Sequence, residues 1–262
     1  MKVTLDQRLA ALRTVRETGE GRIPDALARD LDAVLTHSGE RRQRSPEHTV
    51  VGIFGATGSG KSSLVNALVG ADVARTHVRR PTTSEAHAVV WDPDGAVDLL
   101  DWLQVRERTV RDGPIDPRAA KLVLLDLPDF DSVERANREI AERLAAQVDA
   151  LVWVVDPQKY ADAVLHTDFI ATHSRHGAVT IVVLNQVDLL PAADVARVVD
   201  SLRGLLAADG LPGVRIVATS ATSGVGVDVL REAIGALADA KLAQAARLAA
   251  DVSALADGIP PA

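Results

Sequence analysis

The sequence has no cysteine among its 262 residues, and aromatic side chains make up only 3% of it. The missing thiols exclude disulfide bridges, thiol catalysis and cysteine-ligated metal centres, although they say little about the cellular compartment. Trp91, Trp102 and Trp153 are the only tryptophans. We predict that they are packing residues rather than a base-stacking platform, because no basic surface accompanies them.

Long apolar runs and an excess of positive charge are also missing. No apolar run approaches the 18 residues that a membrane span needs, and the charged segment 1–13 does not resemble a signal sequence. The formal charge is −7 and the pI is about 5.5, so no basic surface for nucleic acid or anionic membranes is indicated. We expect a cytoplasmic protein that does not bind nucleic acid. Membrane association is expected only if the chain is part of a longer protein, and residues 257–262 resemble a linker.

Hydrophobic periodicity divides the chain into helical and strand segments. Apolar residues recur on one helical face over 4–17 and 25–36, and the basic segment 39–46 between these helices and the first strand is predicted to be a solvated linker. Continuous Val, Leu and Ile runs then alternate with helical patterns, as is typical of strands buried on both faces. Strands are expected at 49–54, 86–91, 121–126, 150–155, 178–184 and 214–218, and helices at 61–69, 132–147, 160–174, 192–208 and 226–239.

This alternation predicts an α/β fold, a doubly wound, mostly parallel sheet with flanking N- and C-terminal helices. A short helix followed by an edge strand is expected in the segment between residues 91 and 121. With 47% hydrophobic residues the chain has enough apolar side chains for one large core. We expect an N-terminal helical extension and linker over 1–48, a main domain over 49–239, and a C-terminal helix and tail over 240–262. The last helix is expected to pack with the two N-terminal helices beside the sheet.

The most informative motif is Gly55-Ala56-Thr57-Gly58-Ser59-Gly60-Lys61-Ser62, which fits G-x-x-x-x-G-K-[ST] and directly follows the expected strand. Its glycines allow successive backbone N–H groups to curl around a polyphosphate. Lys61 is expected to reach the β and γ phosphates, and the Ser62 hydroxyl to ligate Mg²⁺. The predicted phosphate-binding residues are Gly55, Thr57, Gly58, Ser59, Gly60, Lys61, Ser62 and Ser63.

Two later motifs indicate which base is bound. Asn185-Gln186-Val187-Asp188 follows a buried strand and resembles the N-K-x-D motif of translation-factor-related GTPases. The resemblance implies that the Asp188 carboxylate accepts from guanine N1–H and the exocyclic amine, and that Asn185 ties the motif to the phosphate loop. Thr219-Ser220-Ala221 resembles the S-A-x motif, in which the N–H of Ala221 would contact guanine O6. The residues that the resemblance assigns to the base are Asn185, Gln186, Asp188, Ser220 and Ala221.

Asp126-Leu127-Pro128-Asp129 resembles the D-x-x-G motif, with Asp126 expected to hold a water or Mg²⁺. The expected glycine is replaced by Asp129. Its N–H is still expected to face the γ-phosphate, whereas its carboxylate would be repelled by it. The next position, where Ras-like enzymes carry a water-orienting glutamine, holds Phe130, which cannot orient water by hydrogen bonding. We therefore expect hydrolysis to be slow unless another group assists.

The segment Arg79-Arg80-Pro81-Thr82-Thr83-Ser84 lies where a first switch loop belongs. Thr83 is expected to reach Mg²⁺ and the γ-phosphate, with Thr82 as the neighbour that could substitute. Arg79 and Arg80 either supply transition-state charge or form surface ion pairs. The expected metal ligands are thus Ser62, Thr83 and Asp126, and the expected catalytic residues are Lys61, Thr83 and Asp126.

The order and spacing of these motifs over residues 49–239 resemble the Era/EngA branch of the TRAFAC P-loop GTPases. The Arg-Arg-Pro-Thr-Thr-Ser and Asp-Leu-Pro-Asp-Phe-Asp-Ser segments look closest to the YfjP-like bacterial subgroup. The resemblance implies a P-loop GTPase fold that uses Mg²⁺ and binds GTP and GDP. Two further departures matter: Gly58 occupies the position of the asparagine found in K⁺-using enzymes, and Gln186 replaces a lysine, which predicts modest affinity.

Three functions remain open at this point. The first is a Mg²⁺-dependent, GTP-hydrolysing switch, and the second is a nucleotide-gated binding module with negligible hydrolysis. The third is the GTPase domain of a dynamin-like, membrane-associated protein, which the flanking helices and the basic linker suggest. Besides the guanine nucleotide, a nucleotide-dependent homodimer or an activator protein is the expected partner.

Overall fold

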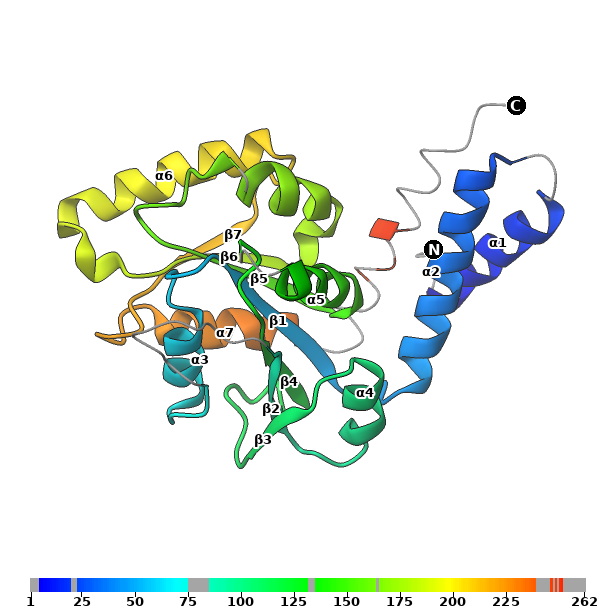
Figure 1. Ribbon diagram of the computed structural model, residues 1–262, viewed down its shortest axis with the longest axis horizontal. Coiled ribbons are helices and arrows are strands. Elements are labelled where there is room, and N and C mark those ends of the chain that lie inside the picture. The colour runs from blue at the N-terminus through cyan, green and yellow to red at the C-terminus, as the bar shows by residue number, and fades with distance from the viewer. Residues whose placement is uncertain are drawn as a thin grey trace.

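The computed structural model describes residues 5–19, 23–74, 85–131, 135–163, 165–238, 246, 248 and 250–251. They form one sheet with helices on both of its faces (Figure 1). The strands are β1 (Thr49–Gly55), β2 (His87–Trp91), β3 (Glu107–Arg111), β4 (Leu122–Asp126), β5 (Ala150–Val155), β6 (Thr180–Leu184) and β7 (Arg215–Ala218). The helices are α1 (Leu5–Thr18), α2 (Asp25–Gln43), α3 (Lys61–Val69), α4 (Ala96–Trp102), α5 (Arg135–Gln147), α6 (Ala192–Ala208) and α7 (Val227–Leu237), with the short helices η1 (Leu165–Ile170), η2 (Ala171–Val179) and η3 (Val187–Leu189).

The sheet has the strand order β3-β2-β4-β1-β5-β6-β7. Strands β4, β1, β5, β6 and β7 run parallel, while β2 is antiparallel to β4 and carries β3 along its outer side. The α/β class and the mostly parallel sheet are therefore confirmed, and α4 followed by the edge strand β3 matches the predicted insertion. Because five strands run in parallel, their carboxyl ends and the loops that follow lie along the same edge of the sheet.

The central strands β1, β4, β5 and β6 are mostly apolar and are buried at every position, so both faces of the sheet are covered. On one face α4, α5, η1 and α6 pack around Trp153, whose ring centroid lies 4.8 Å from that of Phe54. On the other face α3 and α7 contribute Leu64 and Leu230, both fully buried. This double cover holds the strand ends, and the loops that follow them, in fixed positions.

The helices α1 and α2 form a hairpin with a small apolar core of its own (Figure 1). One prediction was wrong here: α2 continues to Gln43, through the segment expected to be a solvated linker. Arg41 is 4% exposed, and its guanidinium forms an ion pair with Asp149 at 2.5 Å. It also donates to the backbone carbonyls of Arg44 and His48, both at 2.8 Å. The basic pattern showed the charge of Arg41, but the partner that buries it lies 108 positions away in the sequence.

A second prediction needs correction at residues 160–174, which were expected to form an α-helix. The chain turns after Asp156 and then forms the π-helix η1 and the 3-10 helix η2. His166, at the start of η1, is held on both sides: one ring nitrogen pairs with the Asp209 carboxylate, and the other lies 2.8 Å from the Tyr160 carbonyl oxygen. These contacts with side chains and carbonyls outside the helix fix a geometry that hydrophobic periodicity alone does not distinguish from an α-helix.

The predicted last helix is described only at residues 246, 248, 250 and 251, all of which are helical. Ala246 packs against the α3 and α7 side of the core, and Asp251 pairs with Arg175 and His176 in η2. These contacts place the segment on the sheet, while its expected packing with α1 and α2 lies mostly outside the described residues. Within the described part, none of the helices combines the length and the apolar character of a membrane span.

Candidate nucleotide-binding site

The loop between β1 and α3 has the backbone conformation that its glycines permit. Gly60 has φ +82°, and a Cβ placed there would lie 2.6 Å from the Asn185 side-chain nitrogen. Gly58 has φ +86°, a region that residues with a side chain rarely adopt. The loop delivers the chain into the first turn of α3, whose N-terminal N–H groups favour an anion. Loop and helix together form a phosphate cradle.

Lys61 opens α3 and is only 6% exposed. Its ammonium donates to the Gly55 carbonyl at 2.9 Å and forms an ion pair with the Asp129 carboxylate. Sequence reasoning assigned to Asp129 a backbone N–H facing the γ-phosphate and a repelled carboxylate. The structure adds that this carboxylate lies directly on the lysine of the phosphate loop.

A second carboxylate, Asp126 at the end of β4, lies beside the same loop. Its Oδ2 accepts from the Ser62 hydroxyl at 2.8 Å, and its Oδ1 is buried with no hydrogen-bond partner among the described residues. Burial raises the pKa of the Asp126 carboxyl; the Lys61 ammonium and the Ser62 hydroxyl oppose this, and the Asp129 carboxylate reinforces it. A buried carboxylate oxygen with free lone pairs beside a serine hydroxyl is a donor set that suits Mg²⁺. The residues present therefore fit the expected metal.

Asn185, directly after β6, joins the loops. Its side-chain nitrogen donates to the Ser59 carbonyl at 3.0 Å. Its oxygen accepts from the Thr219 hydroxyl at 3.1 Å and from the Ala221 N–H at 3.3 Å. One buried amide thus connects the phosphate loop with the loops after β6 and β7.

Gln186 has a positive φ of 59° and donates from its side-chain amide to the Gly58 carbonyl at 2.7 Å. Asp188 lies two residues later in η3 and is exposed. On the neighbouring loop, the Ser220 hydroxyl accepts from the Ser223 N–H at 3.1 Å. The residues predicted to contact the base are therefore brought together on two adjacent loops.

Two predicted site residues remain, Thr83 and Ser63. Thr83, with Thr82, Arg79 and Arg80, falls in the segment 75–84, which lies outside the described residues. Ser63 is described, and it is exposed on the first turn of α3.

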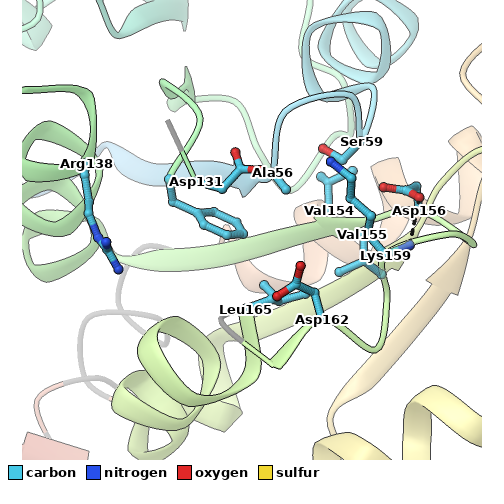
Figure 2. Close-up of a pocket in the computed structure, with 11 residues that line it drawn as sticks. Ala56, Ser59, Asp131, Arg138, Val154, Val155, Asp156, Lys159, Asp162 and Leu165 are labelled. Atoms are coloured by element: carbon cyan, nitrogen blue, oxygen red, sulfur yellow. Dashed lines mark hydrogen bonds between the residues drawn. The ribbon is translucent and has the colours of Figure 1, made fainter. Parts of the chain in front are cut away.

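Sequence reasoning missed two side chains that hold the phosphate loop from outside. Asp131 accepts from the N–H and the hydroxyl of Thr57 at 2.7 and 2.9 Å, and Lys159 donates to the Thr57 carbonyl at 3.1 Å. Both line a cavity of about 230 Å³ beside the loop, and Figure 2 shows them around Ala56 and Ser59. Lys159 follows the Asp156-Pro157 turn after β5, so only the strand order, with β5 next to β1, could have predicted its contact.

Comparisons with known proteins agree with this geometry. Residues 50–186 match the family described as 50S ribosome-binding GTPase. The chain is 31% identical to the probable GTP-binding protein EngB of Brucella melitensis over 73% of this chain and 76% of EngB. It is 30% identical to the tRNA modification GTPase MnmE of Bacillus cereus over 73% of this chain and 35% of MnmE, so it spans about a third of that relative. The fold is similar to that of Aquifex aeolicus Era bound to GDP and AlF4⁻, with a TM-score of 0.53 and 21% identity over 73% of this chain and 57% of Era.

Proposed function

We propose, since the chain belongs to the family of 50S ribosome-binding GTPases, that it is a Mg²⁺-dependent molecular switch that binds and hydrolyses GTP. The observation that carries the proposal is the set of bonds made by Asn185, which holds the phosphate loop against the two loops assigned to the base. We assign the site to a GTPase domain over 49–239, with 1–48 as a helical extension and 240–262 as a C-terminal helix and tail.

The phosphate end of the nucleotide lies in this proposal on the loop 55–62, with Lys61 contacting the β and γ phosphates. Bound Mg²⁺ would be held by Ser62, Asp126 and Thr83, and it would neutralise charge on the β and γ phosphates. The two switch segments around Thr83 and Asp129 order against the γ-phosphate and relax once it leaves.

Guanine selection is assigned to Asp188, whose exposed carboxylate is free to accept from N1–H and the exocyclic amine. Adenine offers no such pair of donors. The variant Asp188→Asn is expected to weaken GTP binding and to improve binding of xanthosine triphosphate, because the exchanged donor and acceptor suit that base. Equal GTP affinity in variant and parent would refute the assignment.

Hydrolysis is proposed to be slow because the residue at the glutamine position is part of the core. Phe130 is 2% exposed, and its ring centroid lies 4.4 Å from that of Phe169 and 6.1 Å from that of Trp153. Its ring lines the cavity beside the phosphate loop, but it offers no polar atom that could orient a water. An activator protein or a second copy of the chain would then supply the missing group, so turnover per molecule should rise with protein concentration if the second copy is the source.

The buried position of Phe130 also favours a second candidate function, a nucleotide-gated binding module with negligible hydrolysis. Multiple-turnover phosphate-release assays with GTP, at rising protein concentration and with Lys61→Ala as the control, separate the two. Release that depends on Mg²⁺ and disappears in the variant supports the enzyme. Intact GTP binding without release at any concentration supports the module.

Nucleic acid is left out of the proposed partners because the formal charge is −7. The family description names the 50S ribosome and the MnmE name refers to tRNA modification, so RNA is the partner whose binding has to be measured to test this exclusion. We expect no salt-dependent RNA binding by this chain.

Chromatographic identification of the nucleotide that copurifies with the protein tests the proposal at the outset, with GDP or GTP expected.

A further inference from the structure

We infer that Asp129 sets the preference of this site between GDP and GTP, because its carboxylate takes the place on Lys61 that the γ-phosphate needs. The inference rests on the proposed function. It concerns the one position at which this chain departs from the D-x-x-G pattern and brings a charge into the cradle.

While the pair with Asp129 is intact, most of the hydrogen-bond donors of the Lys61 ammonium are already used. An ammonium has three N–H donors. One is donated to the Gly55 carbonyl at 2.9 Å, one is taken by the Asp129 carboxylate, and the Ala56 carbonyl lies 3.5 Å away. GDP needs only one donor of Lys61 for its β-phosphate, whereas GTP needs contacts to both β and γ phosphates. GDP is therefore compatible with the ion pair, and GTP is not.

Charge strengthens the difference between the two nucleotides. The side chains of Lys61 and Asp129 are 6% and 10% exposed, so solvent and salt screen their interactions only weakly. A γ-phosphate that displaced the Asp129 carboxylate from Lys61 would bring like charges together beside a second carboxylate, Asp126. Mg²⁺ held at Ser62 and Asp126 would offset part of this repulsion. The repulsion that remains weakens the binding of GTP, and it does not act on GDP, which has no γ-phosphate.

The ion pair also differs from a structural contact that the fold requires. Besides Asp129, Lys61 has two backbone carbonyls within reach, those of Gly55 at 2.9 Å and Ala56 at 3.5 Å. A glycine at position 129 would remove the acceptor from Lys61, and an asparagine would replace the charged acceptor with a neutral one that competes less with phosphate. The carboxylate thus acts as an internal substitute for the γ-phosphate.

The test measures dissociation constants for Mg²⁺·GDP and for the slowly hydrolysed analogue Mg²⁺·GMPPNP by calorimetry. The parent is compared with Asp129→Asn, with Asp129→Gly and with the matched control Asp32→Asn, which removes the same charge from an ion pair outside the site, the one that Asp32 forms with Arg16. The parent is expected to bind GDP at least about tenfold more tightly than GMPPNP. Both Asp129 variants should tighten GMPPNP binding about tenfold and change GDP binding less than about threefold, while Asp32→Asn leaves the ratio within about twofold.

An unchanged GDP to GMPPNP ratio in both Asp129 variants would overturn the inference, with GDP binding intact and the proposed function unharmed. A parent that binds no guanine nucleotide would overturn the proposed function and the inference together. Thermal melts of each variant establish that the proteins compared are folded, and Asp129→Gly replaces Asp129→Asn if the amide is not tolerated.

Discussion

Two buried ion pairs of the same chemistry lie at opposite ends of the parallel strands. At the amino end, Arg41 of α2 pairs with Asp149 just before β5. At the carboxyl end, Lys61 of α3 pairs with Asp129 after β4. Both pairs are largely hidden from solvent, yet their surroundings differ.

Around Arg41 the polar groups have partners. The guanidinium also contacts backbone carbonyls, and the Asp149 carboxylate accepts from the Val50 N–H at 2.8 Å. Around Lys61 two buried oxygens, the Ser59 hydroxyl and Asp126 Oδ1, have no hydrogen-bond partner in the described part of the chain. Because buried polar groups are normally satisfied, the first pair is structural, and the second belongs to a site that is completed by a ligand.

The largest expected change in stability comes from removing one partner of the structural pair. Arg41→Ala should lower the free energy of unfolding by about 3–5 kcal/mol, because it leaves the Asp149 carboxylate buried without its partner. Arg16→Ala is the control, since Arg16 and Asp32 form a partly exposed pair at 2.8 Å between α1 and α2 and should contribute about 1 kcal/mol or less. Chemical denaturation measures both. Equal losses in the two variants would contradict the structural role of Arg41.

The second prediction concerns the removal of Lys61 from its pair with Asp129. Lys61→Ala should weaken guanine nucleotide binding by more than about a hundredfold, since we propose that the ammonium contacts the phosphates. It should lower the free energy of unfolding less than Arg41→Ala does, because Arg41 also donates to two carbonyls at 2.8 Å, whereas Lys61 has one such short carbonyl contact, to Gly55 at 2.9 Å. Nucleotide titration and denaturation of the same preparation give both values. A larger loss of stability than in Arg41→Ala would remove the contrast between the pairs.

The two ion pairs also show which parts of the structure can be predicted from the sequence. The phosphate loop, the motif at Asn185 and the strands before them are local patterns, and the structure brings them together at the predicted edge. The Arg41–Asp149 pair spans 108 positions, and the Lys159 contact with Thr57 spans 102. Such contacts depend on which strands become neighbours, and side-chain charge alone does not encode that. Sequence reasoning accordingly placed Arg41 in solvent and missed Lys159.

The third prediction concerns pH and Asp126. Burial raises the folded-state pKa of its carboxyl above the ordinary value of 3.8, so the folded protein holds the proton more tightly than the unfolded chain does. The contribution of Asp126 to stability is therefore undiminished below pH 3.8 and falls as the pH rises from there through the folded-state pKa. In nucleotide-free protein without Mg²⁺, the melting temperature of the parent minus that of Asp126→Asn should decrease over this window. A difference that is flat or rises with pH would contradict the assignment.

The smallest expected effect on nucleotide affinity comes from Gln186, in the motif assigned to the base. Gln186→Ala removes the bond from the side-chain amide to the Gly58 carbonyl and should weaken GDP binding about fivefold, the value of one net hydrogen bond. Gln186→Lys should raise affinity above that of the parent, because an ammonium can reach the same carbonyl and lysine is the residue that the motif resembled by 185–188 carries at this position. Fluorescence titration with a labelled GDP measures both, and identical affinity in the alanine variant and the parent would show that this bond does not support the site.

The central claim, that the loops at the carboxyl edge of the sheet hold a guanine nucleotide at both of its ends, is tested most directly by calorimetric titration of the full chain. GDP, GMPPNP and ATP are each titrated with Mg²⁺ present. The account predicts saturable binding of GDP, weaker binding of GMPPNP and no measurable binding of ATP. ATP binding as tight as GDP binding, or no heat with either guanine nucleotide, would contradict it.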